Sequence, residues 1–372
     1  MPYWRLSSFY FAYFAALGAL VPFWGLYLQD LGFSPLAISQ LIGVLMATKV
    51  LAPNLWGWIS DRSPARMPLI RLAAFLTLLS FLPILFLREF WGIALVMGLF
   101  GFFWNAALPQ MEAVTLNHLG ARIHRYARIR LWGSLGFILS VLSLGGLIPD
   151  FGIGLVPWLV CLCYLGLWLS TLRIEECTPT TATEEQGNLW EQIKRPEIAA
   201  FLTSVFLMQM SHGAYYAFYS IHLSEAGYSS LAVGALWAEG VVAEILIFLK
   251  MPQLLDRFGP RPILLTSLGL AAVRWLLIGA FAAYPWVQIL AQSLHAASFG
   301  AFHAAAIYLV HGYFTGNLQG RGQALYNSLG FGAGTALGTF LSGFFWERWG
   351  AFGTFSLAAL AAALGGLIAS RN

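Results

Sequence analysis

The chain has 372 residues, of which 59% are hydrophobic and only 10% are charged, and its mean hydropathy is +0.72. An ordinary soluble domain has about 25% charged residues, so the composition excludes one. The net charge of +4 does not indicate nucleic-acid binding, because the Arg and Lys residues lie in short loops between apolar runs and form no basic face or tail.

Apolar runs of about 20 residues, the length of a helix that crosses a bilayer, recur along the whole chain. They cover residues 7–28, 36–59, 68–87, 91–117, 126–148, 152–172, 197–223, 230–255, 263–283, 287–313, 322–346 and 351–369. The runs are continuous and do not alternate at period two, which favours helices over barrel strands. We therefore expect an all-α polytopic membrane protein with twelve transmembrane helices.

The loops between these runs predict the orientation of the helices. Fourteen of the 20 Arg and Lys residues fall on the side that holds both termini, and two, Arg88 and Arg348, fall on the other. The basic side of a membrane protein faces the cytoplasm, so both termini are expected there. The one long polar stretch, between Arg173 and Arg195, predicts a cytoplasmic linker over residues 178–195.

The two halves of the chain repeat each other at an offset of 195 residues. Asp61-Arg62 corresponds to Asp256-Arg257, and Gly18-Ala19 corresponds to Gly213-Ala214. This repeat predicts two pseudo-symmetric six-helix bundles, over residues 1–177 and 196–372. Parallel repeats of this kind place a solute site near the bilayer midplane, where the repeats meet.

The first loop motif carries a family resemblance. The segment from Gly57 through Asp61 and Arg62 resembles the signature between helices 2 and 3 of the major facilitator superfamily, although Pro64 stands where a glycine is usual. Asp256-Arg257 is its counterpart in the second half. The resemblance implies the major facilitator fold and assigns these residues to a loop that takes part in conformational change.

Longer segments resemble one group within that superfamily, the phenylpropionate permeases. They include residues 22–24, 128–134, 212–216 and 240–245. This group is related to the lactose permease and the nucleoside–proton symporters. The resemblance implies proton-coupled transport of a small organic solute across a bacterial inner membrane.

Ionisable residues inside spanning helices are costly and are functional candidates by default; the competing interpretation is a structural ion pair. Glu112 and Arg130 are the first such pair. Hydropathy alone would leave them as interfacial charges in water. The lactose permease has an acid and an arginine at the same spacing that contact sugar, so the resemblance implies that this pair lies deeper and faces the cavity. An arginine fork suits either a hydroxyl or a carboxylate.

The repeat identifies a second pair. Lys49 and Glu244 are 195 residues apart and therefore occupy equivalent places on the second and eighth helices. We expect the two charges to pair across the cavity. Glu239 lies more than a turn nearer the outside, where it either shares the proton-carrying role or lies half exposed in a vestibule.

A third group comprises Arg274 on the ninth helix with His295 and His303 on the tenth. Arg274 and His295 match an arginine and a histidine of the lactose permease. Eight residues separate the two histidines, so they project about 80° apart on an α-helix and nearly share a face.

Two departures from the lactose permease accompany this group. That protein has a lysine three residues before its histidine and a glutamate three residues after it, and this chain has Gln292 and Ser298. Its principal proton carrier is therefore missing here, and Glu244 is the expected replacement. A metal site built from the histidines and this glutamate is not expected, because no ligand set is complete at tight spacing.

Aromatic residues could line a solute cavity. His212, Tyr216 and Tyr219 recur at helical spacing on one face, with Tyr215 beside them. Trp24 and Tyr219 are also 195 residues apart, so one ring would stand on each side of the cavity. The alternative is that these rings pack in the helix core with hydrogen-bonded polar tips.

We therefore expect a monomeric secondary transporter that needs no cofactor and no metal, and whose partners are a small solute, protons and the lipid bilayer. Glu244 would carry the proton, while Arg274, His295, Lys49 and His303 tune its pKa. An aromatic carboxylate such as a phenylpropionate-like acid is the expected solute. An oligosaccharide or nucleoside symporter, a proton-driven exporter and a non-transporting receptor or scaffold are the alternatives. Neither a nucleotide-binding loop nor a nucleophile beside a base occurs, so an enzyme is not expected.

Overall fold

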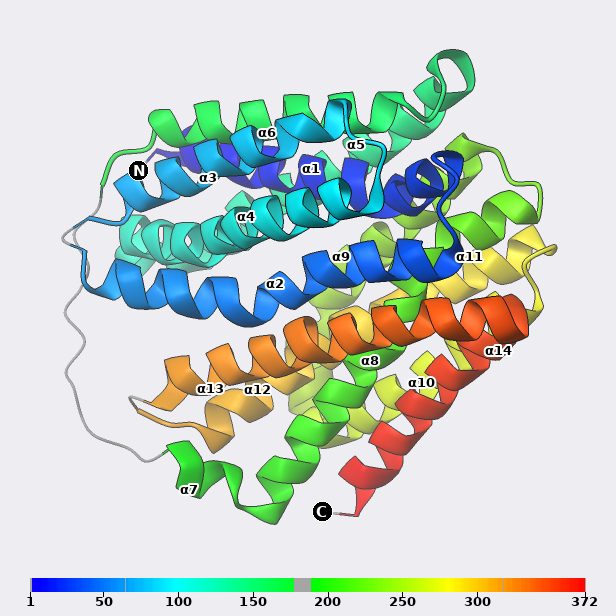
Figure 1. Cartoon of the computed structure of the whole chain (residues 1–372). Coiled ribbons are helices and arrows are strands. Elements are labelled where there is room, and N and C mark those ends of the chain that lie inside the picture. Colours follow the sequence, from blue (N-terminus) through cyan, green and yellow to red (C-terminus); the bar gives the residue numbers. More distant parts are fainter. Residues whose placement is uncertain (1, 64, 177–188, 317, 372) are drawn as a thin grey trace. The chain divides into compact units, whose positions relative to one another are not determined.

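The computed structural model describes residues 2–63, 65–176, 189–316 and 318–371, which form helices and no strands (Figure 1). The helices of the first half are α1 (Tyr3–Asp30), α2 (Pro35–Asp61), α3 (Met67–Phe81), α4 (Phe90–Leu119), α5 (Tyr126–Phe151) and α6 (Leu155–Leu172). Those of the second half are α7 (Leu189–Ile193), α8 (Pro196–Glu225), α9 (Ser230–Phe258), α10 (Pro260–Ala280), α11 (Pro285–Ser293), α12 (Phe302–Tyr313), α13 (Leu318–Asn327) and α14 (Thr335–Ser370).

Ten helical segments of the described chain are long and apolar enough to cross a membrane. Two features complete the expected pattern. The last segment, Leu318–Ser370, contains a kink at Gly350, where φ is 62° and where glycine is favoured because it lacks a Cβ. The 30-residue helix α8 is more polar and is not among the ten. The prediction of an all-α membrane protein is confirmed, and splitting at Gly350 and adding α8 gives twelve membrane-length helices within the described residues.

The helices group into two compact units. Unit 1 contains residues 1–33, 51–182 and 229–235, and unit 2 contains residues 34–50, 183–228 and 236–372. In unit 1, α1 lies beside α5 and α6, and α3 lies beside α4 and α6 (Figure 1). In unit 2, α14 lies beside α8 and α10.

These units differ from the predicted halves in two helix starts. The first half of α2 belongs to unit 2, where the backbone N–H of Leu36 donates to Glu347 Oε1 at 3.1 Å and Ser39 contacts Gly343. The first turns of α9 belong to unit 1, because Gly234 lies against the backbone of Val141. The predicted linker lies mostly outside the described residues.

Glycines allow the closest helix crossings within each unit. In unit 1, a Cβ on Gly18 of α1 would lie 2.5 Å from the carbonyl oxygen of Phe137 in α5, and one on Gly136 would overlap the carbonyl of Phe11. In unit 2, Gly213 of α8 contacts the backbone of Thr339 in α14 equally closely. Gly18 and Gly213 are the residues that the 195-residue offset relates, so each unit has a glycine at the same position in a close helix crossing.

Candidate functional site

The predicted Glu112–Arg130 pair is present in unit 1. Arg130 Nε of α5 lies 3.8 Å from Glu112 Oε1 of α4, and the two side chains remain 32% and 36% exposed. The hydroxyl of Tyr126 donates to the same carboxylate oxygen at 3.1 Å. Glu112 therefore has two partners while both charges stay accessible.

Aromatic rings flank this arginine. The Arg130 guanidinium lies 4.0 Å from the ring centroid of Phe14 and 5.6 Å from that of Tyr10, both on α1. The hydroxyl of Tyr10 donates to Thr115 Oγ1 at 3.0 Å, which fixes the ring. The result is a half-buried cation beside apolar ring surface, an arrangement that suits a solute with a negative charge next to an apolar group.

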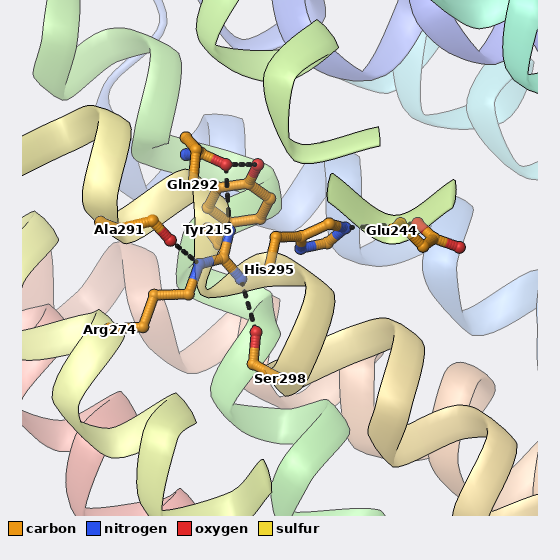
Figure 2. Close-up of polar contacts among 7 residues, drawn as sticks. All are labelled: Tyr215, Glu244, Arg274, Ala291, Gln292, His295 and Ser298. Carbon is orange, nitrogen blue, oxygen red and sulfur yellow. Dashed lines mark hydrogen bonds and ion pairs between the residues drawn. The ribbon is translucent and has the colours of Figure 1, made fainter. Parts of the chain in front are cut away.

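A second ionisable pair lies in unit 2. His295 Nε2 is 3.6 Å from Glu244 Oε2 of α9, and the side chains are 11% and 21% exposed. Figure 2 shows the imidazole between Glu244 and a cluster of polar groups around Arg274. The two groups form an ion pair when the imidazole is protonated.

Two glycines bring the helices of this pair together. A Cβ on Gly240 of α9 would lie 3.1 Å from Gln292 Oε1 and 3.5 Å from His295 Cδ2. A Cβ on Gly300 would lie 2.9 Å from Ile247 Cγ2 and 3.2 Å from Glu244 Cγ. Each helix thus presents a glycine to the ionisable residue of the other.

The helix that carries His295 is not regular. It consists of α11, the π-helix η3 (Ala296–Ala301) and α12. The rings of His295, Phe299 and His303 stack along it, with centroid distances of 5.1 and 6.4 Å and interplanar angles of 11° and 15°. An α-helix would have separated the two histidines by about 80°; the wider π turn aligns residues four apart more closely. His303 Nδ1 is hydrogen-bonded to the hydroxyl of Tyr326 at 2.9 Å.

Arg274 of α10 is completely buried. It donates from Nε to the carbonyl oxygen of Ala291 at 3.0 Å, from one terminal nitrogen to Ser298 Oγ at 3.1 Å and from the other to Gln292 Oε1 at 3.3 Å (Figure 2). No carboxylate of the described residues lies within ion-pair distance of it. The sequence identified Gln292 and Ser298 only as departures from the lactose permease and did not predict that they bind Arg274. Their positions, three residues before and three residues after His295, were the feature that could have indicated this role.

The predicted aromatic face of α8 is packed inside unit 2. His212 is fully buried, donates from Nδ1 to the carbonyl of Met208 at 2.9 Å and meets the ring of Trp275 edge-on at 4.8 Å. The hydroxyl of Tyr215 donates to Gln292 Oε1 at 3.1 Å, and its ring lies 4.9 Å from that of Tyr219. These contacts match the core alternative for His212, Tyr215 and Tyr219.

Tyr216 and Trp24 differ from each other in exposure. Tyr216 is half-buried, 6.2 Å from the His212 ring. Trp24 of α1 is only 2% exposed and packs on Tyr27 and Phe81 in unit 1. Its role as a cavity wall stays a prediction that this packing does not support.

The expected ion pair between Lys49 and Glu244 is absent from the described residues. Both belong to unit 2, but Glu244 contacts His295, and Lys49 Nζ has neither a hydrogen bond nor an ion pair within the described chain. Glu239 accepts a hydrogen bond from Ser293 Oγ at 2.7 Å. The repeat relates Lys49 and Glu244 by their positions along the chain, but the Glu244 carboxylate lies beside His295.

The loop-motif residues lie at helix ends. Arg62, which follows the end of α2, donates to the carbonyl of Trp58 at 3.2 Å and stacks on its ring at 4.1 Å. Asp256 and Arg257 are exposed near the end of α9. Gly57 lies in α2; Asp61 is the last residue of that helix, and its side chain lies outside the description. Among the described residues no group of three or more metal-binding side chains gathers.

The chain resembles known membrane transport proteins in sequence and in structure. Residues 3–357 match the model of the MFS_1-like family. A protein of Escherichia coli (strain K12) named "probable 3-phenylpropionic acid transporter" is 33% identical, over 96% of this chain and 94% of that protein. The maltose permease of Geobacillus stearothermophilus is 27% identical, over 92% and 87%. A crystal structure of the nucleoside transporter NupG, in a mutant form, superposes with a TM-score of 0.88 at 17% identity, covering 99% of this chain and 98% of that one.

Proposed function

We propose that this chain, which belongs to the MFS_1-like family and is a multi-pass membrane transporter of a small solute and not an enzyme, couples uptake of an aromatic carboxylate to protons. Transport proceeds by alternating access. Glu244 carries the proton together with His295, and Arg130 binds the carboxylate of the solute. Both termini face the cytoplasm, and the monomer is the working unit.

The Glu244–His295 contact is the observation that supports proton coupling. A charged carboxylate resists transfer into an apolar environment, whereas its protonated form crosses at much lower cost. The imidazole lies 3.6 Å from the carboxylate, so the pair takes up one proton from one side of the membrane as a unit and gains one positive charge. Release of that proton to the other side removes the charge without moving a group from helix to helix.

Replacement of the carboxylate tests this role. Glu244→Gln mimics the permanently protonated form, so it should abolish pH-driven accumulation in proteoliposomes and leave exchange of internal for external solute largely intact. Glu197→Gln is the matched control, because this acid lies at the exposed start of α8 in an ion pair with Arg195. Loss of accumulation and exchange together would instead make Glu244 a structural or solute-binding residue.

The Arg130 cluster supports an aromatic carboxylate as the solute. Its guanidinium is half-buried and lies against Phe14 and Tyr10. One site can therefore bind the carboxylate of a solute through the guanidinium and its aromatic ring through these two side chains. The relative with 33% identity is named for a phenylpropionic acid, which agrees with this chemistry. Stacking between aromatic rings adds about 0.5–1.5 kcal/mol beyond burial, or roughly a tenfold preference at the upper end.

Competition distinguishes the solute classes. Uptake of labelled 3-phenylpropionate should be inhibited by unlabelled 3-phenylpropionate about tenfold more strongly than by 3-cyclohexylpropionate, which keeps the charge and chain length but has no aromatic ring. Maltose and uridine should not compete. If a neutral sugar or nucleoside is transported and the acids are not, the carboxylate assignment is wrong and the Glu112–Arg130 pair serves hydroxyl groups.

A further inference from the structure

We propose that Arg274 is a positioning residue that clamps the junction between α11 and η3 and thereby sets where His295 meets Glu244. The inference rests on the proposed role of the Glu244–His295 pair. It assigns functions to Gln292 and Ser298 as anchors of the clamp, and it makes the shape of the Arg274 side chain matter more than its charge.

The junction is a place where a helix needs outside support. α11 ends at Ser293, the π-helix η3 begins at Ala296, and His295 is the residue that precedes it. Where an α-helical hydrogen-bond ladder changes to a π ladder, carbonyl groups lose their regular partners and the helix can bend. The angle of the His295 ring therefore depends on how this junction is held.

Arg274 holds the junction from a neighbouring helix. Its guanidinium binds Ala291 and Gln292 before His295 and Ser298 after it, through three donors at 3.0, 3.3 and 3.1 Å. The planar fork of an arginine can reach three acceptors in fixed directions, which a lysine ammonium on a flexible stem cannot do. Figure 2 shows these three bonds on the side of His295 that faces away from Glu244.

The same network also packs against the His295 ring. The guanidinium lies 4.5 Å from the centroid of Tyr215, and the Tyr215 ring is stacked on His295 with a centroid distance of 6.2 Å. The Tyr215 hydroxyl donates to Gln292 Oε1, the atom that also accepts from Arg274. The Arg274 side chain thus holds the backbone carbonyl of Ala291, the ring of Tyr215 and the amide of Gln292.

Among the described residues, Arg274 has no acidic partner, which favours a role through hydrogen-bond geometry over a role through charge alone. All three acceptors are neutral, and the two ring faces of Tyr215 and Trp275 complete the surroundings of the guanidinium. Burying a positive charge without a carboxylate beside it is costly. If Arg274 acted only through its charge, a nearby acid would lower that cost. If Arg274 acts through the directions of its hydrogen bonds, neutral acceptors are sufficient.

Four variants test the clamp in proteoliposomes. Arg274→Lys keeps the charge and loses the fork, Arg274→Gln loses both, and Ser298→Ala removes one anchor. Arg261→Lys is the matched control, since it makes the same change at an exposed position of α10. We expect the ratio of pH-driven accumulation to exchange to fall about tenfold in both Arg274 variants and about threefold in Ser298→Ala, as charge-assisted bonds are lost, and to stay constant in Arg261→Lys. If Arg274→Lys works like the parent while Arg274→Gln fails, charge is sufficient and the clamp is refuted.

A spectroscopic readout separates this inference from the proposed function. In protein labelled with ¹⁵N-histidine, the His295 signals are identified by their loss in His295→Gln. They should shift in Arg274→Lys and Ser298→Ala and stay in place in Arg261→Lys. Unshifted signals overturn the clamp whatever the transport result, whereas normal accumulation by Glu244→Gln overturns the coupling role and leaves this comparison valid. Ser298→Ala removes a single hydroxyl, so it keeps the test open if an Arg274 variant fails to fold. It should add nothing in the Arg274→Gln background.

Discussion

Gly300→Ala is predicted to uncouple transport by separating the proton-carrying pair. The new Cβ would lie 2.9 Å from Ile247 Cγ2 and 3.2 Å from Glu244 Cγ, whereas carbon atoms pack at about 3.5–4.0 Å. We expect the two helices to move apart by about 0.6–1 Å. Overpacking of this kind costs about 1–3 kcal/mol, so we expect the protein to fold with a lower melting temperature.

The electrostatic consequence follows from the same displacement. Lengthening the His295–Glu244 distance from 3.6 Å by about 1 Å weakens a Coulomb interaction by about 1 kcal/mol at an effective dielectric constant of about 20. This corresponds to about a fivefold change in the equilibrium between the two charge states of the pair. We expect pH-driven accumulation to fall about fivefold while exchange falls less than twofold.

The control is another glycine of the same membrane span. Gly312 lies in α12, and a Cβ there would meet no atom within 4 Å. Gly312→Ala should gain up to about 1 kcal/mol of helix propensity and transport normally. The measurement is solute accumulation against exchange at a fixed pH gradient, with thermal unfolding measured for each variant. Normal accumulation by Gly300→Ala, or an equal loss in Gly312→Ala, would refute the argument.

Three further outcomes are expected. Gly338→Ala should lower the melting temperature by several degrees, because its Cβ would overlap the Met210 carbonyl, while Gly269→Ala, with no atom within 4 Å, should not; equal melting temperatures would contradict the crossing. Reporter domains fused after residue 372 or near residue 187 should be active only as cytoplasmic fusions, and an external signal would overturn the topology. Arg130→Lys should raise the KM for 3-phenylpropionate at least tenfold, because the bidentate fork is lost; an unchanged KM would remove Arg130 from the solute site.

The helices could be predicted from the sequence because continuous apolar runs have only one stable form in a bilayer. The predicted run at 197–223 corresponds to α8 (Pro196–Glu225), although this helix is too polar to stand out by hydropathy alone. The π-helical junction after His295 could not be predicted, since a π turn has no compositional signal. The predicted angle of about 80° between His295 and His303 assumed a regular α-helix, and it does not hold because residues 296–301 form a π-helix.

The candidate site was predictable where spacing along the chain decides contact. Glu112 and Arg130 lie on two helices joined by one short connection. The resemblance to the lactose permease identified them as a pair, and the structure places them in contact. The Glu244–His295 contact depends on the rotation of two helices that are distant in sequence. The repeat relates Lys49 to Glu244 by position, but a repeat does not fix which way either side chain turns.

The glycine crossings have a consequence for how such proteins diverge. At Gly18, Gly136 and Gly213 the neighbouring helix is met through its backbone, so the crossing does not depend on the identity of the side chains around it. Substitutions elsewhere on the same helices can then change a binding surface without changing the path of the chain. The nucleoside transporter NupG has the same fold at 17% identity, with a TM-score of 0.88, so most side chains of this fold can differ while the path of the chain is kept.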